Sequence, residues 1–153
     1  MGVKVMNGER PLLEGYVSQK TRGWQNRTVA FLSECARSKF RPGKLDCGLF
    51  FAEGCLVMTG RDIAEPFRGN YRTIEDGLAI ARGLGFSDHA TYAESFFPEL
   101  PSPLWAVHGD GAVLEDAEGI PVLGIVQGES IYDMGLQGIG TVPLTAAKRT
   151  FRV

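Results

Sequence analysis

The pattern of apolar residues changes once along this chain, near Pro103, and this change limits the fold more than any other feature. Before Pro103, apolar residues recur at steps of three and four, which is typical of helices that bury one face. After it come four short segments rich in β-branched residues: GAVLE, PVLGIVQ, SIYDM and GTVPL. Helices first and strands second indicate an α+β protein. We therefore expect N-terminal helices packed on a small C-terminal antiparallel sheet in meander order.

The chain has 153 residues, which is enough for one domain. Residues 1–23 contain four glycines and a proline with little periodicity, so we interpret them as an N-terminal arm that docks on a partner or on its own domain. Residues 24–153 form the single expected domain. Its last segment, TAAKRTFRV, predicts a helical turn followed by a final strand.

Four helices are expected before Pro103. The first begins at Trp24 and ends before a turn at Pro42 and Gly43. Residues at helical spacing define its buried face: Trp24, Thr28, Phe31, Leu32 and Cys35. Thr73 caps the third helix, with Asp76 completing a variant capping box, and Ser87 caps a short fourth helix.

The second helix carries the residue that decides the class of protein. Asp46 is a favoured N-cap, and Gly60 lies where a glycine ends a helix. The residues between them are apolar on nearly every side, which predicts a central, buried helix. Cys47 then lies in the first helical turn.

Two interpretations of Cys47 are open. A helix N-terminus stabilises a thiolate, so Cys47 can be a nucleophile that faces a His base on the sheet. It can equally be a small hydrophobic residue that begins the core. Cys35 lies on the buried face of the first helix and Cys55 has apolar neighbours, so both are expected in the core.

Composition excludes several other classes. The net charge of −2 provides no basic excess for nucleic acid. No apolar run approaches the roughly 18–20 residues of a membrane span, and no signal peptide is visible, so we expect synthesis and retention in a cytoplasm. Three Cys and two His without close spacing predict no disulfide framework, no structural metal and no cofactor.

The segment LDCGLFFAEGCLVMTG resembles the nucleophile segment of the NlpC-type papain-like cysteine peptidases, and Gly109-Asp110 resembles the pair that opens their strands. More narrowly, residues 24–153 resemble an uncharacterised NlpC-like family of tailed phages and prophages. The shared features are an early Trp before a helix, TGRD with FRGNYR, GDGAVL, LGIVQG and a terminal aromatic-Arg-Val. This resemblance implies a papain-like fold in which the helices pack on a sheet or partial barrel.

The resemblance also assigns roles to individual residues. Cys47 holds the nucleophile position and Asp46 is the N-cap beside it. Active relatives carry a His base at the start of a strand, where this chain has Val122, and a valine side chain cannot accept a proton. His108 is the substitute base that remains, although an exposed loop position is equally consistent with its sequence context. His89, in the first turn of the fourth helix, is expected at the surface.

The first hypothesis is a structural or assembly protein of a phage tail tip or baseplate. It is made in the host cytoplasm and carried in the virion tail. The arm and exposed aromatic residues (Phe67, Tyr71, Trp105) would bind tail proteins such as the hub and the distal tail protein.

The alternative is a cysteine peptidase that cleaves peptidoglycan cross-links of the bacterial cell wall during phage entry. It would use Cys47, His108 and backbone N–H groups near Cys47. A third hypothesis is a small-ligand domain with a pocket lined by Phe50, Phe51 and Trp105.

Overall fold

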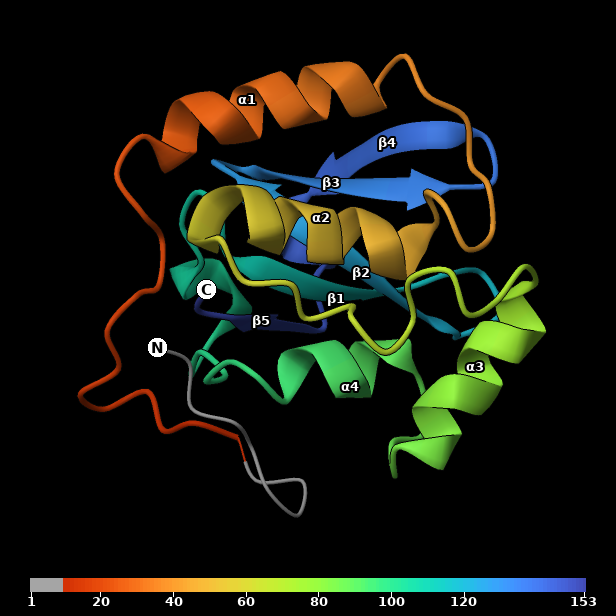
Figure 1. Cartoon of the computed structure of the whole chain (residues 1–153). Coiled ribbons are helices and arrows are strands. Elements are labelled where there is room, and N and C mark those ends of the chain that lie inside the picture. The colour runs from red at the N-terminus through yellow and green to blue at the C-terminus, as the bar shows by residue number, and fades with distance from the viewer. Residues whose placement is uncertain (1–9) are drawn as a thin grey trace.

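The computed structural model of the chain describes residues 10–153, in which four helices precede a five-stranded antiparallel sheet (Figure 1). The helices are α1 (Trp24–Cys35), α2 (Cys47–Thr59), α3 (Ile74–Gly83) and α4 (His89–Glu94). The strands are β1 (Gly111–Glu115), β2 (Pro121–Gln127), β3 (Ser130–Gly135), β4 (Gly138–Pro143) and β5 (Arg149–Phe151). The 3₁₀ turns are η1 (Pro103–Trp105) and η2 (Leu144–Ala146). The expected α+β class is confirmed, with the change of pattern at η1.

The strand order is β4-β3-β2-β1-β5. Strands β1 to β4 form the expected meander, and β5 returns to the other edge of β1, where Phe151 pairs with Gly111. In the pairing of β1 with β2, Glu115 lies opposite Pro121. The bounds predicted for β1 and β2 match the structure.

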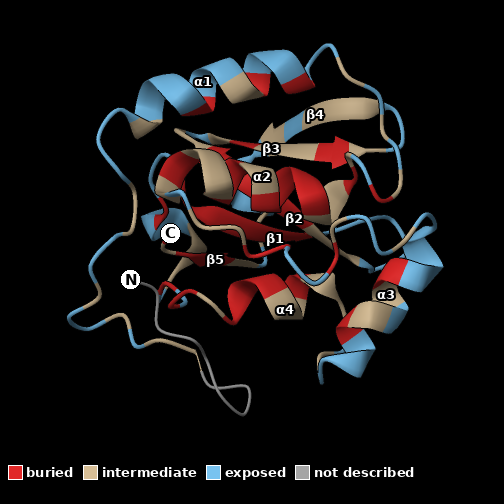
Figure 2. Cartoon of the chain, in the orientation of Figure 1, coloured by how far each residue is buried: buried red, intermediate tan, exposed pale blue. Residues whose placement is uncertain are grey.

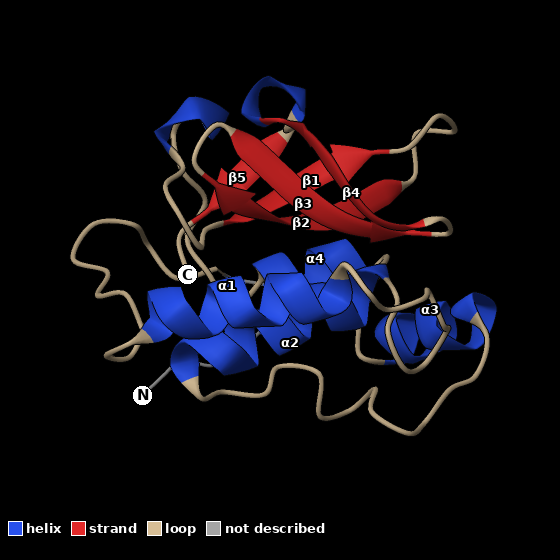
Figure 3. Cartoon of the chain, turned by 90° about the horizontal axis from the view of Figure 1, so that it is seen from above, coloured by secondary structure: helices blue, strands red, loops and turns tan. Residues whose placement is uncertain are grey.

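The molecule has two layers, because all four helices lie on one face of the sheet (Figure 3). Alternation along β2 directs Leu123 and Ile125 into the core shared with the helices, and Val126 into a smaller cluster on the opposite face. Helix α2 packs against β2 and β3 and contacts both α1 and α4, and most of it is buried (Figure 2). Its expected central position is confirmed, because it has no polar face to present to water.

The helix boundaries follow from their caps. Asp46 caps α2 by accepting from the Leu49 N–H, and Gly60 ends it with a φ of 77°. The fourth helix begins one residue later than expected. Its N-cap is Asp88 and not Ser87, because the Asp88 carboxylate accepts from both the backbone N–H and the hydroxyl of Thr91.

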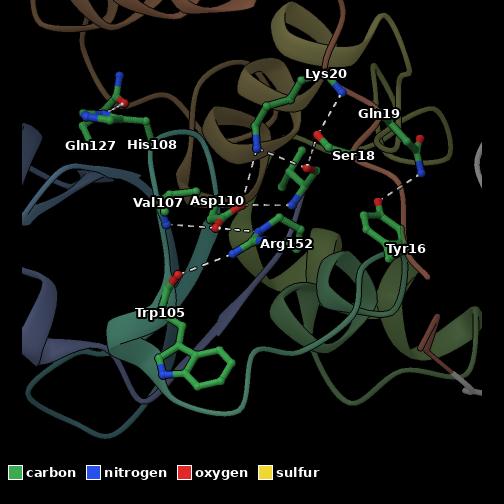
Figure 4. Close-up of polar contacts among 11 residues, drawn as sticks. Tyr16, Ser18, Gln19, Lys20, Trp105, Val107, His108, Asp110, Gln127 and Arg152 are labelled. Carbon is green, nitrogen blue, oxygen red and sulfur yellow. Dashed lines mark hydrogen bonds and ion pairs between the residues drawn. The ribbon is translucent and has the colours of Figure 1, made fainter. Parts of the chain in front are cut away.

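The described part of the expected arm, residues 10–23, lies against its own domain; residues 1–9 lie outside the described residues. Ser18 donates to the main-chain oxygen of Val153, and the Lys20 ammonium lies 3.4 Å from Asp110 (Figure 4). These contacts join the first described segment to the end of the sheet. Within residues 10–153, no helix combines the length and apolar character needed to cross a bilayer.

Candidate active site

The N-termini of α2 and α4 bring a cysteine and a histidine together. Cys47 is the first residue of α2 and His89 is the first residue of α4. The distance from Cys47 Sγ to His89 Nε2 is 3.4 Å. His89 is half-buried, so its expected surface position is wrong. A thiol within hydrogen-bond reach of an imidazole is the arrangement needed for nucleophilic catalysis by cysteine.

The dyad is held by rigid neighbours. The buried Asp46 carboxylate accepts from the Leu49 N–H at 2.9 Å, the Gly43 N–H at 3.0 Å and the Tyr71 hydroxyl. These three donors fix Asp46 as a cap, so its carboxylate has a positioning role and does not face the dyad as a base. Asp88 fixes the start of α4 in the same way and so orients His89.

Burial keeps both members of the dyad neutral at rest. Burial raises the pKa of the Cys47 thiol to about 12, although the Leu123 N–H, which donates to Sγ at 3.1 Å, acts in the opposite direction. Burial also lowers the pKa of His89 below its ordinary value, with Asp88 opposing this shift. At neutral pH the pair is therefore a thiol beside a neutral imidazole whose Nε2 can accept the thiol proton.

Unused backbone donors lie beside the sulfur. The N–H groups of Cys47 and Gly48 belong to the first turn of α2, where no helical acceptor exists. Within residues 10–153, neither N–H donates a hydrogen bond. Free N–H groups next to a nucleophile can form an oxyanion hole for the carbonyl that it attacks.

The dyad opens into a cavity of about 500 Å³. Most of its wall is apolar and comes from α2, the segment between α2 and α3, α3, α4, the start of β2, and β3: Leu49, Ala52, Ile63, Ala64, Leu78, Ala93, Pro121, Val122 and Met134. Among residues 10–153, three carboxylates line it, those of Asp46, Asp116 and Asp133, and no lysine or arginine does. A ligand of this cavity therefore meets apolar atoms and negative charge.

The structure places His108 elsewhere. The imidazole of this exposed residue lies 2.9 Å from the Gln127 amide oxygen (Figure 4), and it lines a second cavity with Trp24. Its neighbour Gly109 faces Met58, eleven residues after Cys47 and thus about 16 Å farther along α2. His108 is too distant to take a proton from Cys47.

Val122 lines the dyad cavity, and the next residue, Leu123, donates its N–H to the Cys47 sulfur. The strand position where a base was expected is therefore beside Cys47, but the imidazole comes from α4. The role of His89 as partner of Cys47 could not be recognised from the sequence, because its neighbours indicate only the start of a short helix. One signal was present: Asp46-Cys47 and Asp88-His89 are both Asp-capped helix starts.

Two aromatic assignments need correction. Phe67 is buried, because it packs edge-to-face against Tyr92, so it is not available for docking. Phe50 and Phe51 are fully buried core residues and do not line the cavity. Trp105 is exposed, as expected.

The raised thiol pKa predicts how Cys47 reacts with iodoacetamide. Alkylation uses the thiolate, whose fraction rises about tenfold per pH unit below the pKa. We expect the alkylation rate of Cys47 to keep rising from pH 6 to beyond pH 9.5, measured by peptide mass spectrometry on the native protein. Cys35 and Cys55 are the internal controls, and their burial should keep them slower. A plateau below pH 8.5 would instead indicate a preformed thiolate–imidazolium pair.

Comparison with known proteins identifies the family of this chain. A family model described as a domain of unknown function, DUF6950, matches residues 19–153. A search of curated proteins gave no match. The match covers all four helices, the complete sheet, and both members of the dyad.

Proposed function

The chain belongs to the DUF6950 family, and from its site we propose that it is a cysteine-dependent acyl hydrolase or acyl transferase with Cys47 as nucleophile and His89 as base. One observation carries the proposal: Cys47 Sγ lies 3.4 Å from His89 Nε2, and both residues line a cavity. The position of Cys47 at the N-terminus of α2 and the resemblance to NlpC-like peptidases support the same chemistry. In this proposal the general base is His89, at the start of α4, and not His108.

The first half-reaction forms an acyl-enzyme. Cys47 Sγ attacks the carbonyl carbon, a carbon–sulfur bond forms, and the thiol proton moves to His89 Nε2. The oxyanion accepts hydrogen bonds from the N–H groups of Cys47 and Gly48. The tetrahedral intermediate then breaks its bond to the leaving group, which takes the proton from His89.

The second half-reaction restores the enzyme. Water, or another nucleophile, gives a proton to His89 Nε2 and attacks the thioester carbonyl. The carbon–sulfur bond breaks, the acid or transfer product leaves, and the proton returns to Cys47. The lowered pKa of His89 suits this role, because it keeps the imidazole unprotonated at neutral pH.

Covalent trapping tests the proposal. The protein is mixed with 4-nitrophenyl acetate, quenched in acid within seconds, and mapped by peptide mass spectrometry. We expect one acetyl group on Cys47, with Cys35 and Cys55 unmodified. Acetylation that appears only on other residues, or that persists unchanged in His89→Gln, contradicts the proposed chemistry.

A second candidate function is a structural role in a phage tail tip or baseplate. The resemblance suggests it, and one surface supports it: Leu104, Trp105 and Val107 are each more than half exposed. A surface apolar patch of this kind is typical of a protein-binding site. We expect the protein to bind purified hub and distal tail proteins from the encoding phage or prophage. The Trp105→Ser variant should lose this binding, and the Cys47→Ala variant should retain it. Equal binding by both variants contradicts this role.

A further inference from the structure

We propose that the cavity above Cys47 and His89 binds the acyl group of the substrate, and that this group is apolar and carries no negative charge at its far end. The inference rests on the proposed function and names its substrate class. The ester or thioester of a medium-length alkyl or arylalkyl acid fits this description.

The first support is the mouth of the cavity. Three large apolar residues that line it are exposed to solvent: Ile74 at 44%, Ile120 at 49% and Leu136 at 80%. They come from three separate segments, namely the start of α3, the β1–β2 turn and the β3–β4 turn. Apolar side chains from separate segments around one opening are explained by an apolar ligand that covers them.

The second support is the size and composition of the interior. About 500 Å³ is within the range of small-molecule sites and exceeds what a short acyl group would fill. Other lining residues are aliphatic and aromatic, such as Leu78, Val122 and Tyr92. Each methylene buried there adds to binding, so affinity should depend on chain length.

The third support is charge. Asp46 is occupied by its three donors, and Asp116 accepts from the N–H groups of Glu118 and Ile120. Within residues 10–153, Asp133 accepts no side-chain hydrogen bond and forms no ion pair; burial raises the pKa of its carboxyl, and its own backbone N–H acts in the opposite direction. No lysine or arginine of the described chain lines the wall to offset it, so the ionised Asp133 repels a carboxylate or phosphate brought into the cavity.

The test measures kcat/KM for four 4-nitrophenyl esters below their micelle concentrations: acetate, butyrate, octanoate and the monoester of suberic acid. We expect kcat/KM to rise about threefold per added methylene, so that octanoate, with six more methylenes, exceeds acetate by nearly 10³-fold. Suberate has the length of octanoate with a terminal carboxylate, and we expect at least a tenfold lower value for it.

Variants connect these preferences to named residues. Leu136→Ser and Ile120→Ser should each lower the octanoate-to-acetate ratio about fivefold or more. Val29→Ser is the matched control, because Val29 is an exposed apolar residue that lines the other cavity. Asp133→Asn should raise kcat/KM for suberate relative to octanoate about tenfold.

The outcomes separate the two proposals. Equal rates for all four esters, with acyl groups still trapped on Cys47, overturn the apolar acyl site and leave the catalytic dyad standing. A preference for suberate over octanoate would also overturn the apolar acyl site and leave the catalytic dyad standing. Absence of acyl-Cys47 with every ester overturns the catalytic proposal, and the acyl site with it.

Discussion

Replacement of Cys47 by alanine is expected to abolish ester hydrolysis above background, and His89→Gln to lower kcat/KM by about 10²–10⁴-fold. Alanine removes the nucleophile, so no acyl-enzyme can form. Glutamine keeps a polar side chain at position 89 but cannot take the thiol proton, and the high pKa of Cys47 leaves almost no thiolate to act unaided. Steady-state hydrolysis of 4-nitrophenyl octanoate measures both effects.

The second histidine supplies the control. His108→Gln makes the same chemical change at an exposed position that lines a different cavity, so kcat/KM should stay within about twofold of wild type. Thermal unfolding of each variant checks that the fold is retained. A comparable loss in His108→Gln, or full activity in His89→Gln, would remove His89 from the mechanism.

The pH profile gives an independent check on His89. The base must be unprotonated, so kcat/KM should rise with pH through the pKa of His89 and then level off. Because burial lowers that pKa, the midpoint should lie below the ordinary value of about 6.5. The raised pKa of Cys47 predicts no second rise near pH 8–9.

The largest loss of stability is expected on replacing Asp110 by alanine, at about 3–5 kcal/mol. The Asp110 carboxylate is fully buried and joins three parts of the chain (Figure 4). It accepts from Arg152 Nε at 3.0 Å and from the Val107 N–H at 3.0 Å, and it pairs with the Lys20 ammonium at 3.4 Å. Its removal leaves the nearly buried Lys20 ammonium without a counter-charge, bonded only to the Val153 main-chain oxygen, and leaves the Val107 N–H without this acceptor.

Urea and thermal unfolding measure this loss. For a chain of this size the melting temperature should fall by roughly 10 °C or more. Glu99→Gln is the comparison, because its ion pair with Arg10 is exposed and should contribute about 1 kcal/mol or less. The double variant Lys20→Met with Asp110→Ala should regain part of the stability, since it no longer buries an unpaired ammonium. A loss below about 1 kcal/mol for Asp110→Ala would contradict this account.

Local signals in the sequence were sufficient for the elements and their order. Asp46 and Gly60 mark both ends of α2, and alternation with turn residues marks β1 and β2. The cap of α4 was misplaced by one residue because Ser87 and Asp88 are both good caps, and only the geometry of Thr91 decides between them.

The dyad could be predicted only in part. The chemistry of Cys47 was visible because a thiol at a capped helix start has a local meaning. Its partner was not, because the contact with His89 spans 42 positions and depends on how α4 packs against α2. Phe67 was misjudged for the same reason, since its polar neighbours in sequence give no sign that Tyr92 covers it.

The hydrogen bond from the Leu123 N–H to the Cys47 sulfur has a consequence for how this site can vary. The donor is a main-chain group, so almost any side chain at position 123 preserves it, and proline alone removes it. Its placement depends instead on sheet register, which the five-residue turn between Glu115 and Pro121 sets. Insertion or deletion in that turn therefore alters the reactivity of the thiol while every residue of the dyad is unchanged.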